Sequence, residues 1–452
     1  MKLGYYIRNI SRDAVVDGVK NIKRYHISTD KIISDRNPLI IRGAESVIKH
    51  GDRNYTFNIR QSQINTFLAA SSLSHMLDGW TYLSNAFNAI LSGDEATAIH
   101  LSYYAELRSA MSILASEGLG VFSTQHIGAF SPTTNREFPT NRYRPIGTRI
   151  NDRRPTHQFT WEAMEKWSSS TAKPNAEILK IFKVQGRDFY ELTEHFHPTT
   201  AGSTLLTVNA VKGWLKDWCL DIKLYQKDRD NRNEVSYRPQ RIKNFDERIN
   251  FQSMLNNLEK YWSVISPSAV DRFSLLDRYL LRKLYSSLYS NIATTSPKID
   301  LIRNAFNQHG INNESLFSFL DFQAPYEDDH IIFSNANIRN RNSLSILARA
   351  TLLLRISIGL VEQLYIDGGM TKADLSFVWE NYGVESGFWE NTNTPVDFTN
   401  LWFDIQPYFN DMFVDINSAG AMNDLSSIKQ RHPEGINYFG QIHRASLWGT
   451  DF

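Results

Sequence analysis

The sequence predicts a mainly α-helical protein with a large buried core. Apolar residues recur at helical spacing over residues 61–118, and five further segments between residues 251 and 379 also fit a helical pattern. The chain contains 26 Phe, 20 Tyr and 10 Trp, which favours well-packed helix interfaces over a disordered scaffold. With 452 residues, 42% of them hydrophobic, it has enough apolar material for two or three domains or for one large helical body.

The composition is typical of a protein from a reducing compartment. The one cysteine, Cys219, can form neither an internal disulfide nor a cysteine-rich zinc site. Residues 1–6 lack the apolar core and the cleavage site of a secretory signal, and the most apolar window, 344–364, is interrupted by charges. We therefore expect a cytoplasmic protein with no membrane partner. The interrupting residues are Arg349, Arg355 and Glu362.

The first 60 residues differ from the rest of the chain. Short apolar runs at 15–16, 32–33, 39–41 and 55–59 alternate with charges and turn formers. This pattern predicts short strands or an irregular N-terminal cap.

Residues 61–118 are predicted to form two helices joined by a tight turn. Ser92-Gly93-Asp94 interrupts the helical pattern, and the Asp94 side chain is suited to cap the second helix. Gly118 is expected to end that helix, because glycine tolerates the backbone conformation that follows a helix.

The remainder of the chain is divided by two polar segments. Residues 131–157 are predicted to form a long loop, and residues 223–250, dense in both signs of charge, a linker. The domains expected are therefore 1–60, 61–222, 251–416 and a Ser/Gly/Asn-rich, partly mobile tail at 417–452. The helices predicted in the C-terminal half are 251–265, 271–292, 298–309, 343–367 and 372–379.

One segment resembles a known family. The Gly93-Asp94 turn is followed by Tyr103-Tyr104-Ala105, then by small and apolar residues up to Gly118, and then by His126. Over about residues 80–130 this order resembles the HEPN superfamily, which implies a HEPN-like helical bundle with additional helices in the C-terminal half. Small residues let the helices approach closely, so a buried helix hairpin of another kind would share much of the pattern.

The resemblance also implies a chemistry. Many HEPN proteins are metal-independent ribonucleases that use an arginine followed four to six residues later by a histidine. Arg303 and His309 match that spacing here, with the polar Asn304 after the arginine and Gly310 after the histidine. In such a site the histidine moves protons and the arginine offsets charge on phosphorus. The alternative is a surface arginine and a helix-terminal histidine that interacts with the helix dipole.

A second candidate pair lies inside the resembling segment. Arg108 stands one turn beyond Tyr104, and if buried it is expected to pair with Glu106 or Glu117. In the family that this segment resembles, the spacing from glycine to histidine implies a helix-capping or packing role for His126 rather than catalysis.

A local basic patch is the third candidate. The formal net charge is +1, so nucleic-acid binding would have to come from such a patch rather than from the whole chain. Residues 136–154 are the most basic segment, and they are interleaved with aromatic residues that nucleobases stack on. A solvated loop, or one that docks on an acidic protein, is the alternative. The arginines proposed to contact nucleic acid are Arg142, Arg144, Arg149, Arg153 and Arg154.

Two functions follow from these features. The first is a metal-independent RNA-cleaving effector of a bacterial toxin–antitoxin or antiviral defence system, acting as a homodimer on RNA without a cofactor or metal. The second is a non-catalytic helical interaction subunit of a defence or nucleic-acid-associated complex, in which the exposed aromatic residues contact a partner protein.

Overall fold

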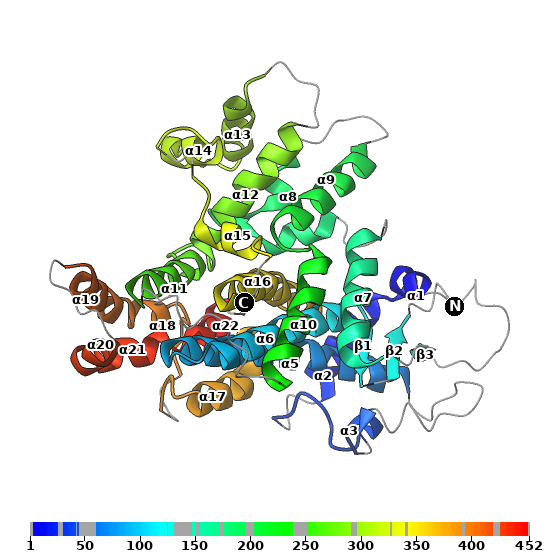
Figure 1. Ribbon diagram of the computed structural model, residues 1–452. Coiled ribbons are helices and arrows are strands. Elements are labelled where there is room, and N and C mark those ends of the chain that lie inside the picture. Colours follow the sequence, from blue (N-terminus) through cyan, green and yellow to red (C-terminus); the bar gives the residue numbers. More distant parts are fainter. Residues whose placement is uncertain are drawn as a thin grey trace.

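The fold is mainly helical, with two small sheets (Figure 1). The computed structural model describes residues 3–25, 30–41, 43–44, 60–123, 125–130, 147–150, 154–170, 176–194, 203–237, 251–290, 296–325, 328–339, 342–390, 394–418 and 425–450.

The N-terminal residues form helices rather than the predicted short strands. They are α1 (Leu3–Asn9), α2 (Arg12–Tyr25) and the short α3 (Pro38–Ile41). In α2, Val15, Val19 and Ile22 are fully buried, so the valine pair belongs to a helical face and not to a strand. The strand predicted at 55–59 lies outside the described residues.

The predicted helix pair is confirmed as α5 (Gln61–Leu91) and α6 (Glu95–Ser116). Asp94 caps α6 by accepting a hydrogen bond from the backbone N–H of Thr97 at 3.0 Å. Gly118 ends α6 with a φ of 101°, in the left-handed region that glycine tolerates.

A three-stranded antiparallel sheet follows α6. Its order is β1 (Leu119–Phe122), β2 (Gln125–Ala129) and β3 (Gly147–Ile150), and Ile127 of β2 pairs with Arg149 of β3. The segment predicted as a loop at 131–157 therefore includes β3 and the first residues of α7 (Thr156–Ser169). Residues 131–146 and 151–153 lie outside the described part.

The region after α7 contains short elements and two longer helices. They are the 3-10 helix η3 (Ala176–Ile181), the two-stranded sheet of β4 (Lys183–Val184) and β5 (Arg187–Asp188), α8 (Phe189–Leu192), α9 (Ser203–Trp218) and α10 (Ile222–Tyr237).

The linker predicted at 223–250 is wrong over its first half, because α10 occupies it. Ile222, Tyr225 and Val235 are buried, and α10 packs against α6 and α7. A few apolar residues are enough to hold α10 in place, because they pack against helices that already belong to the core. Residues 238–250 lie outside the described part.

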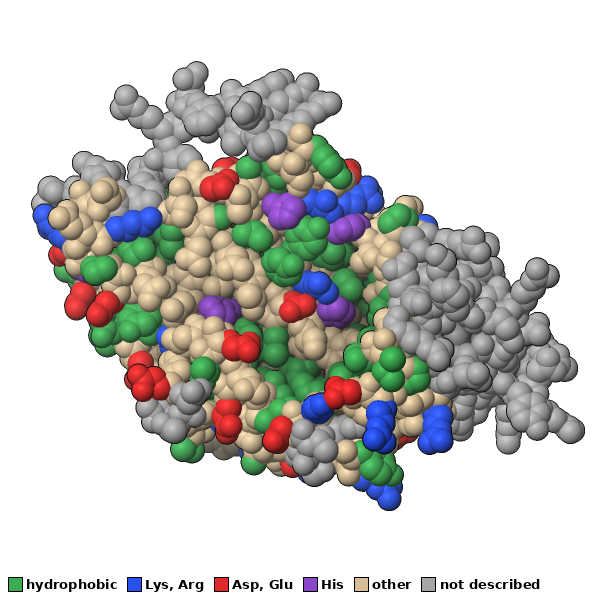
Figure 2. Space-filling view, turned by 90° about the horizontal axis from the view of Figure 1, so that it is seen from below, with side chains coloured by type: hydrophobic (Ala, Val, Ile, Leu, Met, Phe, Trp, Pro, Cys, Tyr) green, Lys and Arg blue, Asp and Glu red, His purple; other side chains and the backbone are tan. Residues whose placement is uncertain are grey.

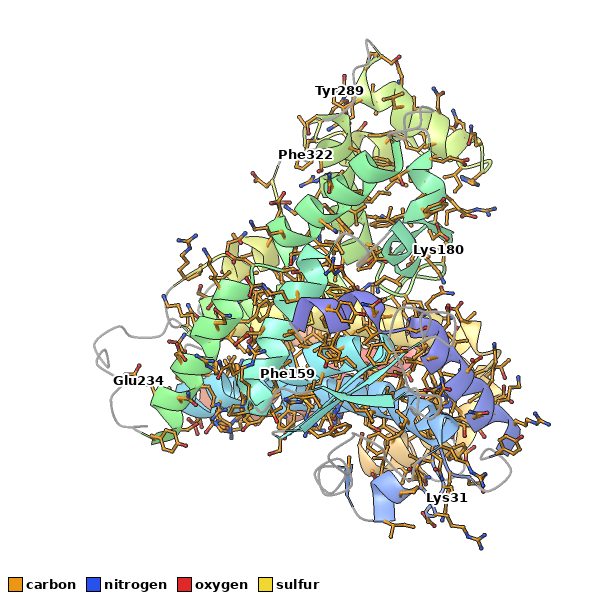
Figure 3. All side chains as sticks on the ribbon, turned by 90° about the vertical axis from the view of Figure 1, so that its right-hand side faces the viewer. Lys31, Phe159, Lys180, Glu234, Tyr289 and Phe322 are labelled. Atoms are coloured by element: carbon orange, nitrogen blue, oxygen red, sulfur yellow. The ribbon has the colours of Figure 1, made fainter. Side chains whose placement is uncertain are left out.

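The C-terminal half agrees with most of the predicted helices. Those at 251–265 and 343–367 are confirmed as α11 and α16, whereas 372–379 divides into the 3-10 helix η5 and the start of α17. Helices α12 to α14 form a lobe that projects from the rest, and Tyr289 and Phe322 mark it in Figure 3. The helices are α11 (Phe251–Ile265), α12 (Ser274–Tyr289), α13 (Lys298–Asn307), α14 (Glu314–Leu320), α15 (Ile331–Ala336), α16 (Ser343–Asp367), η5 (Lys372–Leu375), α17 (Ser376–Glu385), α18 (Asn400–Phe403) and α19 (Gln406–Asn417).

Residues 425–450, which belong to the segment predicted as a partly mobile tail, are folded. They contain α20 (Leu425–Arg431), α21 (Pro433–Phe439), η6 (Ile442–Arg444) and α22 (Ala445–Trp448). Trp448 is fully buried, and its indole N–H donates to the carbonyl of Ile265 at 3.3 Å. The composition predicts mobility here because polar residues predominate in the segment. A few large apolar side chains are nevertheless enough to anchor it in the core.

Helix α16 runs through the centre of the protein and packs against both α5 and α6. Among the described residues it is the one helix long and apolar enough to cross a membrane, and 94% of its most apolar window is buried inside the protein. It joins the predicted 61–222 region to the predicted C-terminal region in a shared core.

Candidate catalytic site on helices α6, α7 and α10

The structure places Arg303 in ion pairs on α13, within the projecting lobe. Its guanidinium lies 2.8 Å from a Glu314 carboxylate oxygen and 3.3 Å from Asp300. His309 follows the end of α13, and its backbone N–H donates to Phe306. Within the described ranges no hydrogen bond or ion pair joins Arg303 to His309. The guanidinium proposed to hold phosphate is thus occupied by two carboxylates of its own lobe.

Arg108 also has partners other than those expected. Its Nη1 lies 3.0 Å from Nδ1 of His75, and its Nε lies 3.6 Å from Asp78, both on α5. Glu106, one of the two expected partners, is fully buried and faces Arg349 instead. Burial, followed by the Arg108 charge, lowers the pKa of His75 to about 3, so this imidazole is neutral.

His126 has the packing role that its spacing favoured. It is fully buried, its ring stacks on Phe159 with centroids 3.5 Å apart, and its Nε2 lies 3.1 Å from the carbonyl of Arg154. A buried imidazole with backbone partners on both nitrogens is satisfied in place, since the N–H of Phe122 donates to its Nδ1.

The arginine patch is described only in part. Arg142, Arg144 and Arg153 lie outside the described residues, and Arg149 stands on β3. Arg154 forms an ion pair with Glu162 of α7, and its guanidinium lies 5.9 Å from the centroid of the Phe159 ring. The Arg154 charge is therefore balanced by a carboxylate of α7.

A different group of residues comes together where α6, α7 and α10 meet. We call it the histidine cluster. Phe159 marks α7 and Glu234 marks the end of α10 in Figure 3. Figure 2 shows several histidine side chains on the lower face of the molecule, some of them beside Lys or Arg side chains. The members of the histidine cluster are His100, Tyr103, Tyr104, His157, Trp161, Arg232 and Ser236.

Arg232 of α10 lies at the centre of the histidine cluster. Its Nη2 is 3.0 Å from Nε2 and 3.3 Å from Nδ1 of His157. Its guanidinium carbon is 5.3 Å from the ring centroids of both Tyr103 and Tyr104, a distance typical of cation–π contacts. In the part of the chain that the structure describes, no carboxylate forms an ion pair with Arg232, and its buried Nε has no hydrogen-bond partner.

Both imidazoles of the histidine cluster contact the same tyrosine. The centroid of the Tyr104 ring lies 4.9 Å from that of His100 and 5.9 Å from that of His157. His100 is oriented by a 2.7 Å hydrogen bond between its Nδ1 and the hydroxyl of Ser236. Two half-buried imidazoles are therefore held near one unpaired guanidinium.

The tautomer of His157 follows from its neighbours. A guanidinium can only donate, and Nη2 of Arg232 lies closer to Nε2 (3.0 Å) than to Nδ1 (3.3 Å), which favours the tautomer in which Nε2 accepts and Nδ1 carries the ring hydrogen. That nitrogen lies 3.0 Å from the Tyr103 hydroxyl, which also accepts from the indole N–H of Trp161 at 3.2 Å. Tyr103 and Arg232 thus both contribute to the orientation of the His157 ring.

The surroundings keep both imidazoles neutral at pH 7. Burial, then the charges of Arg232 and Arg229, lower the pKa of His157 to about 4. Burial and Arg232 also lower the pKa of His100 below its usual value of 6.5. Neutral imidazoles can accept protons, and an unpaired guanidinium attracts an anion, so the arrangement suits acid–base chemistry on a phosphate.

Sequence reasoning missed Arg232 and His157 because it placed both in predicted loop or linker segments. A signal for α10 was present in the sequence, since Ile222, Tyr225 and Val235 are separated by spacings that are sums of the helical three- and four-residue steps. On such a helix Arg232 and Ser236 share one face.

Comparison of the chain with protein-family models, with curated proteins and with solved structures gives no match. No set of three or more His, Cys, Asp or Glu side chains within the described residues is arranged to hold a metal ion. The geometry of the histidine cluster is therefore the feature that points to a function.

Proposed function

We propose that the protein is a HEPN-like, metal-independent endoribonuclease that cleaves RNA at the histidine cluster. The observation that carries this proposal is the unpaired Arg232 guanidinium beside two neutral imidazoles, His100 and His157. The cluster includes Tyr103 and Tyr104, the element on which the resemblance to HEPN proteins rests. The same resemblance supports a role as an effector of a bacterial toxin or antiviral defence system.

Arg232 binds the phosphate in this proposal. Its Nη2 turns from His157 to a phosphate oxygen of the RNA, and a half-buried guanidinium without a carboxylate partner gains from such a contact. This movement frees Nε2 of His157 to accept a proton. The bound anion also raises the pKa of both imidazoles, so that one of them can carry a proton at neutral pH.

The two histidines then have different tasks. Nε2 of His157 takes the proton of the ribose 2′-hydroxyl, and the 2′-oxygen forms a bond to phosphorus. The bond between phosphorus and the 5′-oxygen breaks, its electron pair stays on that oxygen, and protonated His100 supplies the proton. The products are a 2′,3′-cyclic phosphate and a 5′-hydroxyl end, with Arg232 offsetting the charge on the phosphoryl oxygens.

His157 is the better base and His100 the better acid for a physical reason. The greater burial and the two neighbouring arginines depress the pKa of His157 to about 4, which keeps it unprotonated before substrate binds. His100 is affected by Arg232 alone among the charged groups, so it regains a proton more readily when the phosphate arrives.

An aromatic surface lies beside the phosphate position. Tyr82 of α5 stacks on Tyr104 with centroids 5.4 Å apart, and both rings are half-buried. Their accessible parts offer a place for a nucleobase to stack, which supports RNA rather than a small phosphate ester as the substrate.

The experiment is cleavage of an end-labelled RNA in EDTA by the wild type and by His157→Asn, Arg232→Gln, Arg303→Ala and His309→Ala. Loss of cleavage in the first two variants only, with a cyclic phosphate product, is the expected result. Loss in the last two only would return the active site to Arg303 and His309. No cleavage by the wild type together with retained RNA binding would favour the non-catalytic interaction subunit.

A further inference from the structure

A group of three buried charged residues lies beneath the histidine cluster. Glu106 of α6, Asp228 of α10 and Arg349 of α16 have side chains that are 0%, 2% and 3% exposed. We call them the buried triad. They come from three different helices, so their interactions fix how α10 lies on α6 and α16.

Arg349 is fully engaged by the other groups around it. Its Nε and Nη2 bind the two oxygens of Asp228 at 2.7 and 2.8 Å. Its Nη1 donates to the carbonyls of Ala336 and Ile338 at 2.8 and 3.1 Å. Asp228 is thus the carboxylate that neutralises this guanidinium, with two-point geometry.

Glu106 is the carboxyl group of the buried triad that Arg349 does not hydrogen-bond. Its nearest approach to Arg349 is 3.6 Å, and neither of its oxygens receives a hydrogen bond from any donor in the described residues. A fully buried carboxylate without donors is strongly disfavoured. One guanidinium cannot neutralise two carboxylates, so the pair of carboxyl groups must hold one proton between them.

The surroundings assign this proton to Glu106. Burial, then the charge of Asp228, raises the pKa of Glu106 well above its usual value, and the opposing charge of Arg349 does not cancel this rise. The other titratable groups that interact with Glu106 are the neutral side chains of Tyr103, Cys219 and Tyr225. None of these three supplies a positive charge that would ionise it.

We propose that Glu106 is a carboxylic acid that donates its hydrogen to the Asp228 carboxylate, and that the buried triad is the positioning device for Arg232. Asp228 and Arg232 lie four residues apart on α10, so they share one side of the helix. The clamp that Arg349 places on Asp228 therefore also sets where Arg232 meets His157. The positioning role rests on the proposed function, whereas the shared proton does not.

Loss of the shared proton should destabilise the fold as the pH rises. The pKa of Glu106 is higher in the folded protein than in the unfolded chain, so the folded state binds more protons. The stability that Glu106 contributes is present at low pH and is lost as the pH rises from the unfolded towards the folded pKa. Ionised Glu106 would repel Asp228, and α10 would have to move away from α6 to relieve it.

The test compares the full-length wild type with Glu106→Gln, Asp228→Asn and the double variant by urea unfolding between about pH 5 and about pH 9. Glutamine places an N–H donor where the acid has its O–H, so Glu106→Gln should fold and should lose the pH dependence. Relative to it, the unfolding constant of the wild type should rise by up to about tenfold per pH unit, the limit for one proton.

The double variant supplies the matched control. In Asp228→Asn, Glu106 can ionise and neutralise Arg349, so this variant should keep its fold. In Glu106→Gln with Asp228→Asn, Arg349 has no carboxylate left, so unfolding should be far easier than in either single variant. Equal pH dependence in the wild type and Glu106→Gln, or additive effects in the double variant, would overturn the shared proton.

A spectroscopic measurement covers the case in which a variant fails to fold. The infrared spectrum of the wild type should contain the carbonyl band of a protonated acid, which Glu106→Gln removes, and absence of such a band would also overturn the proposal.

The positioning role is read from the Kd for a 2′-deoxy oligonucleotide, which cannot be cleaved. Binding should weaken at alkaline pH in the wild type and not in Glu106→Gln. Unchanged or absent binding would overturn the positioning role and leave the shared proton standing.

Discussion

The Nη2 of Arg232 lies 3.0 Å from the Nε2 of His157, and the two side chains come from helices that are separate in sequence. Because arginine can only donate and Nε2 is the closer ring nitrogen, this contact favours Nε2 as the nitrogen that holds the lone pair. After burial, the positive charge beside the ring also lowers the pKa of His157. The contact therefore keeps a neutral imidazole next to a positive charge, which is the arrangement that the proposed cleavage requires.

Replacing His157 by asparagine should lower the cleavage rate by about 100- to 10,000-fold, the usual contribution of a general base. Asparagine keeps a polar side chain beside Tyr103, so the fold should survive. Single-turnover cleavage of a labelled RNA measures the rate, and circular dichroism checks the fold. A rate within a few-fold of the wild type would exclude His157 as the base.

Arg232→Gln should weaken the binding of a 2′-deoxy oligonucleotide, because one phosphate contact is lost. The slope of log K against log salt should become shallower by about 0.7, the value for one phosphate of a single strand. Arg303→Ala is the control, since that arginine is already paired with Glu314 and Asp300. If the two variants changed the slope equally, Arg232 would not be the specific phosphate contact.

The pH profile of kcat/KM should be bell-shaped with an acidic optimum. The rate should rise as His157 loses its proton near pH 4 and fall as His100 loses its proton below its usual value of 6.5. Removing the Arg232 charge should raise the pKa of His157, read from an NMR titration of its imidazole in Arg232→Gln, because a positive neighbour no longer opposes protonation. An unchanged pKa in this variant would mean that burial and Arg229 set it without Arg232.

Asp277→Asn should destabilise the fold by about 3–5 kcal/mol, the cost of breaking a buried ion pair. Asp277 binds the Arg355 guanidinium at 2.7 and 2.9 Å and also accepts from the backbone N–H of Lys183. Urea unfolding measures the change in the free energy of unfolding. The exposed Asp300→Asn serves as the control and should unfold like the wild type.

Trp448→Ala should also lower the free energy of unfolding, by about 3–5 kcal/mol, because it empties a large buried volume. The same unfolding measurement tests whether the end of the chain belongs to the core. A variant as stable as the wild type would instead support the mobile tail that the composition predicted.

The sequence predicted those parts of the fold that local signals determine. Asp94 and Gly118 mark the ends of α6 through capping and backbone conformation, and the long apolar pattern of α16 is visible without any partner. By contrast, the apolar pair Val15-Val16 was assigned to a strand because two residues do not reveal a period. Helix α10 was missed because tertiary contacts rather than its own composition hold it in place.

Only the part of the candidate site that lies on α6 could be predicted from the sequence. Tyr103 and Tyr104 stood out in the sequence as part of the resemblance. Their partners His157 and Arg232 lie 54 residues from Tyr103 and 75 residues from His157, respectively. Such contacts depend on how three helices cross, and no local pattern encodes that crossing.

The central position of α16 has a consequence for the synthesis of the protein. Arg349 is made 121 residues after Asp228, so a growing chain that already carries every member of the histidine cluster still lacks the helix that clamps α10. Translation adds about 5–20 residues per second, which leaves an interval of several seconds or more before α16 leaves the ribosome. During that interval Asp228 and Glu106 lack the guanidinium that lies beside both of them in the folded protein.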